Sequence, residues 1–308
     1  MKPLIYALLS LMLFVACEDS RRKTIESAPL ISRKYTDDMG TEISLKKPPQ
    51  RLVSLAPNIT EMIYAIGAED KLVGRSEACN YPYEVGEIDE VSLSPVLDVN
   101  FLLDLKPDLV FTTDESFTRE QIDLLRREGL SIYVQSYRSL ADIYDRIIDL
   151  GHILGVQERA VFVSDSLAAL EARIVDSTEV QVQYGTMMLV GNQPLEMVGS
   201  KGILGEILGK SGARNVYADI DSAFVHPTEI QALEKQPEFL IIPSTDDQSY
   251  ANLLAQYPAL YNTPADASKQ VFVIDPEILY RPGPRILEGL MEVTQILHNS
   301  LKREVFVE

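Results

Sequence analysis

The sequence predicts an α/β fold of two similar lobes, each a mostly parallel sheet flanked by helices, joined by a single long backbone helix. Strand-like and helix-like segments alternate along the chain, which is typical of parallel sheets. One uninterrupted helical pattern occupies residues 156–176. On either side of it, Leu103–Phe111 and Leu233–Ile241 share the same order of helix end, proline, acidic residue and apolar strand. The repeat favours two related lobes over one α/β domain.

The central pattern predicts the helix that joins the lobes. Gly155 is suited to end the preceding helix, and Glu158 lies in the first turn, where the helix dipole favours negative charge. At ~1.5 Å per residue the helix spans about 30 Å, the width of a small domain. Its apolar residues recur at gaps of four and three, which places them on one face: Val156, Ala160, Val163, Leu167, Leu170 and Ile174.

The composition limits the possible partners. The chain has 308 residues, of which 46% are hydrophobic, and a formal net charge of −18. This length can bury a sizeable core. Nucleic-acid-binding proteins need a basic surface, so we expect no nucleic-acid partner.

The N-terminus resembles a lipoprotein signal. A short apolar run, residues 4–16, precedes Cys17 and is too short to span a membrane. We expect cleavage after residue 16, lipidation of Cys17 and a tether at 17–32, so that the protein is exported and lipid-anchored. An ordinary signal peptide that contains a cysteine is the alternative. Cys79 is the only other cysteine, which predicts a mature chain without an internal disulfide.

The N-terminal lobe is predicted at 33–154, followed by the backbone helix at 155–178. Asn58 and Glu61 resemble a capping box at the start of the first helix. The patterns predict a hairpin at 33–45, strands at 51–56, 71–74, 108–113 and 131–135, and helices at 59–66, 98–105, 117–128 and 139–154.

The C-terminal lobe is predicted at 179–308 and repeats this alternation. The patterns predict strands at 186–190, 239–243 and 270–274, and helices at 202–208, 227–235, 247–256 and 286–298.

The sequence contains no recognisable catalytic or metal-binding signature, so we expect no enzyme activity, no catalytic residue and no resident metal or cofactor. An exported hydrolase that uses Cys79 as nucleophile and His226 as base is an alternative. Nothing in the sequence brings these two residues together.

The loops between the lobes are rich in aromatic side chains, which is typical of pockets for large organic ligands. The loop at 75–83 follows a predicted strand, where open α/β sheets bind ligands. It contributes Asn80 and Tyr81, and Phe224 and Tyr280 come from the C-terminal lobe. The segment at 279–285 contains a rigid Pro-Gly-Pro turn with an arginine on each side. One arginine could reach a ligand; alternatively, Arg285 pairs within the protein and only Arg281 faces the cleft.

Several segments together resemble one family over about residues 34–298: the substrate-binding lipoproteins of ABC importers for cobalamin, iron-siderophores and haem. The matching segments are RLVSLAPNITE (51–61), Val73-Gly74, LKPDLV (105–110), Gly202 to Val216 and RPGPR (281–285). The CNYP stretch at 79–82 and the RPGPR stretch look most like the cobalamin-binding branch.

The resemblance implies a monomer that captures cobalamin or a related corrinoid between its lobes and delivers it to an ABC permease with its ATPase. It places ligand contacts at Asn80, Tyr81, Phe224, Tyr280 and Arg281.

The resemblance also implies one acidic docking residue on each lobe. Glu229 matches on the C-terminal lobe. On the N-terminal lobe Asn100 stands at the expected position, and Asp98 is the substitute. Cobalamin binders often line the cleft with tryptophan, and this chain has none. Haem or a ferric siderophore is therefore the alternative ligand; for haem, Tyr81, Tyr280 or His226 would be the iron ligand.

Overall fold

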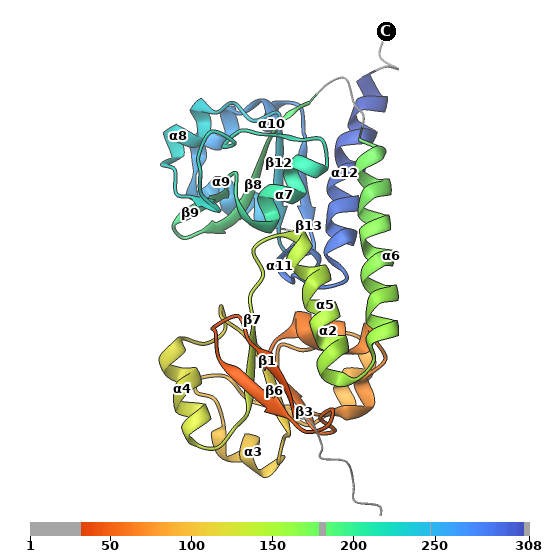
Figure 1. Cartoon of the computed structure of the whole chain (residues 1–308). Helices are drawn as coiled ribbons and strands as arrows, with labels where there is room; N and C mark the ends of the chain where they lie inside the picture. The colour runs from red at the N-terminus through yellow and green to blue at the C-terminus, as the bar shows by residue number, and fades with distance from the viewer. Residues whose placement is uncertain (1–31, 179–182, 247, 305–308) are drawn as a thin grey trace, which may run out of the picture.

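The computed structural model describes residues 32–178, 183–246 and 248–304 (Figure 1). The predicted signal peptide, Cys17 and the tether up to residue 31 lie outside these ranges. No helix within them is long and apolar enough to cross a membrane.

The predicted α/β fold is confirmed: two lobes, each built on a sheet, lie along one side of a long helix (Figure 1). This helix, α6 (Gln157–Asp176), runs from the N-terminal lobe to the C-terminal lobe. It packs against α5 (Leu140–Leu154) and α12 (Ile286–Glu304). At the contact with α5, a Cβ on Gly151 would lie 2.3 Å from the Cβ of Ala160, so the two helices approach closely only because Gly151 has no side chain.

The N-terminal lobe contains a five-stranded sheet in the order β5-β4-β3-β6-β7, and every neighbouring pair is parallel. The predicted hairpin forms a separate antiparallel pair. The elements of this lobe are β1 (Arg33–Thr36), β2 (Glu42–Leu45), β3 (Leu52–Ser54), α2 (Pro57–Ala65), η1 (Glu69–Lys71), β4 (Leu72–Ser76), η2 (Tyr83–Glu87), β5 (Glu90–Val91), α3 (Val99–Asp104), β6 (Leu109–Thr113), α4 (Arg119–Arg127) and β7 (Ile132–Gln135).

The C-terminal lobe contains a mixed sheet in the order β11-β9-β8-β12-β13, with β10 paired to the start of β8. The β8–β12 and β12–β13 pairs are parallel, whereas β9 pairs antiparallel with β8 and with β11. The sequence did not predict β9, β10 or β11. The elements are β8 (Gly185–Asn192), β9 (Leu195–Val198), α7 (Gly202–Lys210), β10 (Arg214–Asn215), β11 (Phe224–Val225), α8 (Glu229–Glu234), β12 (Phe239–Pro243), α9 (Ser249–Gln256), η3 (Pro258–Asn262), α10 (Pro264–Ala267), β13 (Val271–Ile274) and α11 (Glu277–Tyr280).

The hydrophobic core connects both lobes to helix α6. Successive residues of a strand point to opposite faces of the sheet, so each sheet contributes to two apolar clusters. Phe111 and Ile241 belong to one cluster that runs through both lobes by way of α5, α6 and α12. Val110 and Leu240 belong to clusters confined to their own lobes.

The internal repeat is visible in the backbone. Lys106 and Gln236, each just before the shared proline, have nearly the same left-handed conformation, with φ of 47° and 48°. The acidic residue after the proline then holds the start of the neighbouring strand. Asp108 Oδ2 accepts from the backbone N–H of Arg51 at 3.0 Å, and Glu238 Oε2 accepts from that of Gly185 at 2.6 Å.

Candidate ligand cleft between the two lobes

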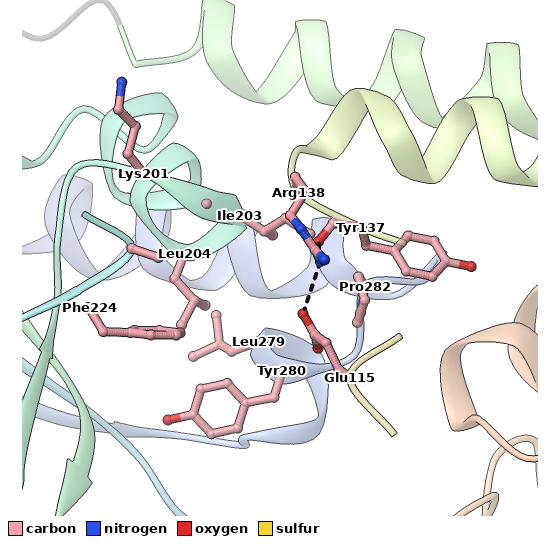
Figure 2. A pocket seen from close by; sticks show the side chains of 12 residues that line it. Glu115, Tyr137, Arg138, Lys201, Ile203, Leu204, Phe224, Leu279, Tyr280 and Pro282 are labelled. Carbon is pink, nitrogen blue, oxygen red and sulfur yellow. Dashed lines mark hydrogen bonds and ion pairs between the residues drawn. The ribbon is translucent and has the colours of Figure 1, made fainter. Parts of the chain in front are cut away.

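A cavity of about 290 Å³ lies where the two lobes meet (Figure 2). Its N-terminal wall includes Glu115, Tyr137 and Arg138, and its C-terminal wall includes Phe224 and Tyr280. The cavity is therefore shared between the two lobes.

The N-terminal wall lies just beyond the carboxyl end of β7, where parallel sheets place ligand crevices. Tyr137 and Arg138 occupy the short link between β7 and α5. The Arg138 guanidinium donates to Glu115 at 3.3 Å and also to Asp114, which holds it at the cavity. The Tyr137 hydroxyl donates to Gln135 at 2.7 Å, and burial holds its pKa well above the ordinary range.

The C-terminal wall presents two aromatic rings. Phe224 and Tyr280 are 44% and 41% exposed, and both rings lie at the cavity, where they offer flat apolar surface to a ligand. The Tyr280 hydroxyl donates to the carbonyl of Val190 at 3.2 Å. Burial, with a smaller contribution from Glu196, raises the pKa of Tyr280 to about 12. Lys201 also lies at this wall and pairs with Asp221 at 2.9 Å.

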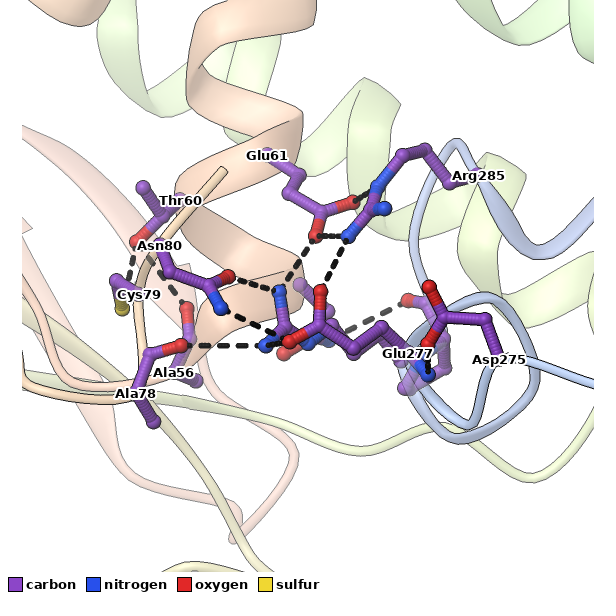
Figure 3. A network of polar contacts seen from close by, with 12 residues as sticks. Ala56, Thr60, Glu61, Ala78, Cys79, Asn80, Asp275, Glu277 and Arg285 are labelled. Atoms are coloured by element: carbon purple, nitrogen blue, oxygen red, sulfur yellow. Dashed lines mark hydrogen bonds and ion pairs between the residues drawn. The ribbon is translucent and has the colours of Figure 1, made fainter. Parts of the chain in front are cut away.

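Beside the cavity, a network of charged side chains joins the lobes (Figure 3). Its centre is Glu61 of α2, a carboxylate that is 2% exposed. Arg285 binds it in two places, through Nε at 3.0 Å and Nη2 at 2.7 Å, and Arg281 Nη1 lies 3.3 Å from it. The hydrogen bonds to Glu61 raise the pKa of Arg285. Bidentate arginine–carboxylate pairs of this kind are among the strongest in proteins.

The network extends to the loop after β4. Arg281 donates to Asn80 Oδ1 at 2.7 Å and to the carbonyl of Ala78 at 3.3 Å. Glu277 accepts from Arg281 at 2.6 Å and from Asn80 at 2.8 Å. The guanidinium of Arg285 lies over the ring of Tyr81, 4.0 Å from its centre, in a cation–π contact.

The backbone at Arg281 separates the cavity from the network. Arg281 has an extended conformation, with φ of −100° and ψ of 103°. Alternate side chains of an extended segment point to opposite sides. Tyr280 and Pro282 therefore line the cavity, while Arg281 points toward Glu61.

A family model described as periplasmic binding protein matches residues 52–278. The chain belongs to the periplasmic binding protein family.

Curated relatives of this periplasmic binding protein include a vitamin B12-binding protein of Vibrio parahaemolyticus, 29% identical over 84% of this chain and 92% of that protein. An uncharacterized ABC transporter substrate-binding lipoprotein of Bacillus subtilis is 26% identical over 87% of this chain and 86% of its own length. These relatives are named as binding and transport proteins, not as enzymes.

Two solved structures resemble this chain with the same TM-score and the same sequence identity. The periplasmic vitamin B12 binding protein of Vibrio cholerae has a TM-score of 0.71 at 25% identity and covers 83% of this chain and 99% of its own. A periplasmic heme binding protein of Pseudomonas aeruginosa has the same TM-score and identity and covers 80% of this chain and 92% of its own. The likeness of fold therefore does not separate the two ligands.

Two of the five predicted ligand residues, Phe224 and Tyr280, line the cavity. The other three, Asn80, Tyr81 and Arg281, belong to the network between the lobes. Their contact with a ligand remains a prediction.

The predicted capping box at Asn58 and Glu61 is wrong. Helix α2 begins after Ala56 with Pro57 in its first turn and has no side-chain cap. Both side chains instead reach the other lobe: Asn58 Nδ2 donates to the carbonyl of Pro282 at 3.3 Å, and Glu61 binds the arginines. Tertiary partners have replaced the local cap.

Cys79 is buried, and its sulfur contacts the hydroxyls of Thr60 and Ser76 at 3.1 and 3.2 Å. His226 is exposed on the other lobe, and its Nε2 lies 3.4 Å from Glu196. The structure therefore does not bring the proposed nucleophile and base together. Within the described ranges, no group of three His, Cys, Asp or Glu residues is arranged to hold a metal ion.

The two predicted docking residues lie at the starts of the equivalent helices α3 and α8 but one position apart in the repeat, because Asp98 is the N-cap of α3 and Thr228 is the N-cap of α8. Asp98 is exposed and caps α3 by accepting from the N–H of Phe101 at 3.0 Å. Glu229 is the first residue of α8 and is half-buried, and its carboxylate accepts from the N–H of Ala259. Asn100 is exposed.

Sequence analysis missed the N-terminal wall and the role of Glu61. Tyr137 and Arg138 follow a parallel strand, so the rule that selected the loop at 75–83 could also have found them. No local signal could have found the role of Glu61, because its partner Arg285 is 224 residues away.

Proposed function

We propose that this periplasmic binding protein captures a corrinoid such as cobalamin in the cavity between its lobes and delivers it to an ABC permease. The observation that carries the proposal is the pair of exposed rings, Phe224 and Tyr280, on one wall of that cavity. Flat apolar surfaces suit a large macrocycle, and a few fixed polar groups orient it.

The charges of the cavity support a ligand of low net charge. Among the described lining residues, the cations are Arg138 and Lys201. Each is already paired with a carboxylate of its own lobe, Arg138 with Asp114 and Lys201 with Asp221. A strongly anionic siderophore would have to displace these partners. Relatives named as vitamin B12-binding proteins support the same choice.

Haem is the second candidate. It is favoured by a phenol within the cavity, Tyr280, and by the solved heme binding protein of similar fold. To bind iron, the Tyr280 hydroxyl would have to lose its proton and give up its hydrogen bond to the carbonyl of Val190. We therefore place haem after a corrinoid.

We further propose that the protein works outside the cytoplasm as a monomer without enzymatic activity, held to a membrane by a lipid on Cys17. In this proposal Asp98 and Glu229 dock with cationic residues of the permease. Asp98→Asn, which keeps an oxygen to cap α3, and Glu229→Gln should each reduce the ATP hydrolysis that the loaded protein stimulates in the reconstituted permease. Unchanged stimulation would contradict these two assignments.

The test of the ligand is a calorimetric titration of the chain from Glu18 onward, which contains every described residue. Cyanocobalamin and haemin are titrated in parallel. We expect saturable one-to-one binding of cyanocobalamin. Binding of haemin alone would assign the cavity to haem, and binding of neither would contradict both ligands.

A further inference from the structure

The network between the lobes contains a charge in an unusual place. Burying a carboxylate is costly unless paired cations and hydrogen bonds compensate. The side chain of Glu61 is only 2% exposed, and those of Arg281 and Arg285 are 14% and 12% exposed. Such a group needs all of its partners in place.

The partners of Glu61 come from the other lobe. Glu61 belongs to α2 of the N-terminal lobe, whereas Arg281, Arg285 and Glu277 belong to the C-terminal lobe. Two carboxylates and two guanidiniums make the group neutral as a whole. Separating the lobes would leave Glu61 without its cations, so the pairing favours one spacing of the lobes.

The same contacts hold the walls of the cavity. Tyr280 and Pro282, which line the cavity, are the sequence neighbours of Arg281. Arg281 also donates hydrogen bonds to Asn80 and to the carbonyl of Ala78 on the opposite lobe. The position of the C-terminal wall relative to the N-terminal lobe thus depends on this group of contacts.

Besides the hydrogen bond from Asn58 to the carbonyl of Pro282 beside the network, a further contact between the lobes joins α7 to the start of α5. Glu206 of α7 accepts from the N–H of Leu140, the first residue of α5, at 3.1 Å. Arg138 and Lys201, which line the cavity, lie close by in the sequence. This is a single hydrogen bond to an uncharged donor, so we expect the Glu61 group to contribute more to the spacing.

We propose that Glu61 is a positioning residue: through Arg281 and Arg285 it fixes the spacing of the lobes and pre-forms the cavity before the ligand arrives. The inference rests on the proposed function for the identity of the ligand. Pre-formed sites bind more tightly because less ordering is needed on binding. If only a fraction of the molecules has the correct spacing, the apparent affinity falls by that fraction.

The experiment measures the lobe separation directly, as the distance between two spin labels determined by pulsed electron–electron double resonance. Glu128→Cys, at the end of α4, and Glu234→Cys, on α8, place the labels on exposed residues of different lobes, on the side away from α6 (Figure 1). Cys79 is buried, and the chain from Glu18 onward lacks Cys17, so the labels should react selectively. The variants are Glu61→Gln and, from the other lobe, Arg285→Gln.

Asp37→Asn is the matched control. Asp37 is also a fully buried carboxylate paired with an arginine, Arg126, at 2.6 Å, but both residues belong to the N-terminal lobe. This change should disturb the lobe without changing the separation of the lobes.

Without ligand, we expect one narrow distance distribution in the parent protein and in Asp37→Asn. We expect a broader distribution, displaced to longer distances, in Glu61→Gln and in Arg285→Gln. Saturating cyanocobalamin should narrow it again. The apparent Kd should rise about 10-fold, mainly through slower association, if a tenth of the molecules keeps the correct spacing.

An unchanged distribution in a folded Glu61→Gln or Arg285→Gln would overturn the proposal, whatever the effect on binding. If one variant does not fold, the other gives the same test from the opposite lobe. Failure of the parent protein to bind cyanocobalamin would contradict the proposed ligand, but the distances would still decide the role of Glu61.

Discussion

One segment of the C-terminal lobe, residues 279–285, contributes to two neighbouring regions of opposite character. On one side, Tyr280 presents an exposed ring to the cavity. On the other, Arg281 and Arg285 are nearly covered and bound to Glu61. In the network the charged groups are paired with protein partners, whereas the cavity leaves aromatic surface exposed.

The contrast indicates that the network and the cavity have different roles. Polar groups that are fully paired within the protein gain little from a ligand but hold geometry well. Exposed aromatic surface gains free energy when a ligand covers it. We therefore expect changes in the network to act mainly on stability and lobe spacing, and changes in the cavity to act mainly on affinity.

The largest effect is expected from Glu61→Ala. It leaves the guanidiniums of Arg281 and Arg285 partly buried without their shared carboxylate, and breaking a buried pair costs about 3–5 kcal/mol. Urea denaturation should show this loss in the free energy of unfolding. Lys34→Ala breaks an exposed ion pair with Glu42 and should cost less than about 1 kcal/mol. If both variants lost the same small amount of free energy of unfolding, the prediction that the network stabilises the protein more than a surface ion pair would be contradicted.

The second prediction concerns the two rings. The double variant Phe224→Ala/Tyr280→Ala should weaken cyanocobalamin binding by about 1–3 kcal/mol, or roughly 5- to 150-fold, if each ring contributes about 0.5–1.5 kcal/mol. The exposed Tyr83, which does not line the cavity, provides the control Tyr83→Ala. Calorimetry that finds the same affinity in the double variant and the control would show that these rings do not form the site.

A third change separates the two candidate ligands. Arg138 is mostly exposed and already paired with Asp114 and Glu115. Arg138→Gln should weaken binding of the uncharged cyanocobalamin by less than about 1 kcal/mol. Haem carries anionic propionates, for which loss of a cation should cost more, about 1.5–3 kcal/mol. Parallel titrations of both ligands against this variant measure the difference, and a loss for cyanocobalamin as large as that for haem would contradict the prediction that Arg138 contributes little to corrinoid binding.

The smallest expected effect concerns pH. The pKa of Tyr280 is raised from 10.0 to about 12, so its stabilising contribution is complete below pH 10 and is lost as pH rises to 12. Tyr280→Phe should therefore make the fall in stability between these pH values shallower.

Tyr217 offers the matched control, because burial also raises its pKa to about 12, away from the cavity. Tyr217→Phe should change the same pH range but leave cyanocobalamin affinity unchanged. Denaturation series at pH 9 to 12 test both variants, and an identical pH profile for Tyr280→Phe and the parent protein would contradict the prediction.

The sequence predicted the parts of the fold that depend on periodic patterns. The apolar spacing of 156–176 identified α6, and the proline-centred repeat identified equivalent strands in both lobes. Strands β10 and β11, of two residues each, are too short for an alternation to be recognised, and β9 has only four residues.

The site was harder to predict than the fold. The segment at 281–285 was correctly placed between the lobes, but the direction of Arg281 depends on its backbone angles, which the sequence does not reveal. Asn58 and Glu61 matched a local capping rule, yet their partners lie in the other lobe. The general reason is that side chains between lobes are positioned by residues distant in the sequence.

The most direct test of the proposed function is the titration of the chain from Glu18 onward with cyanocobalamin and haemin in parallel. We predict one-to-one binding of cyanocobalamin that depends on Phe224 and Tyr280. Binding of haemin with a shifted Soret band, and no binding of cyanocobalamin, would contradict the proposal.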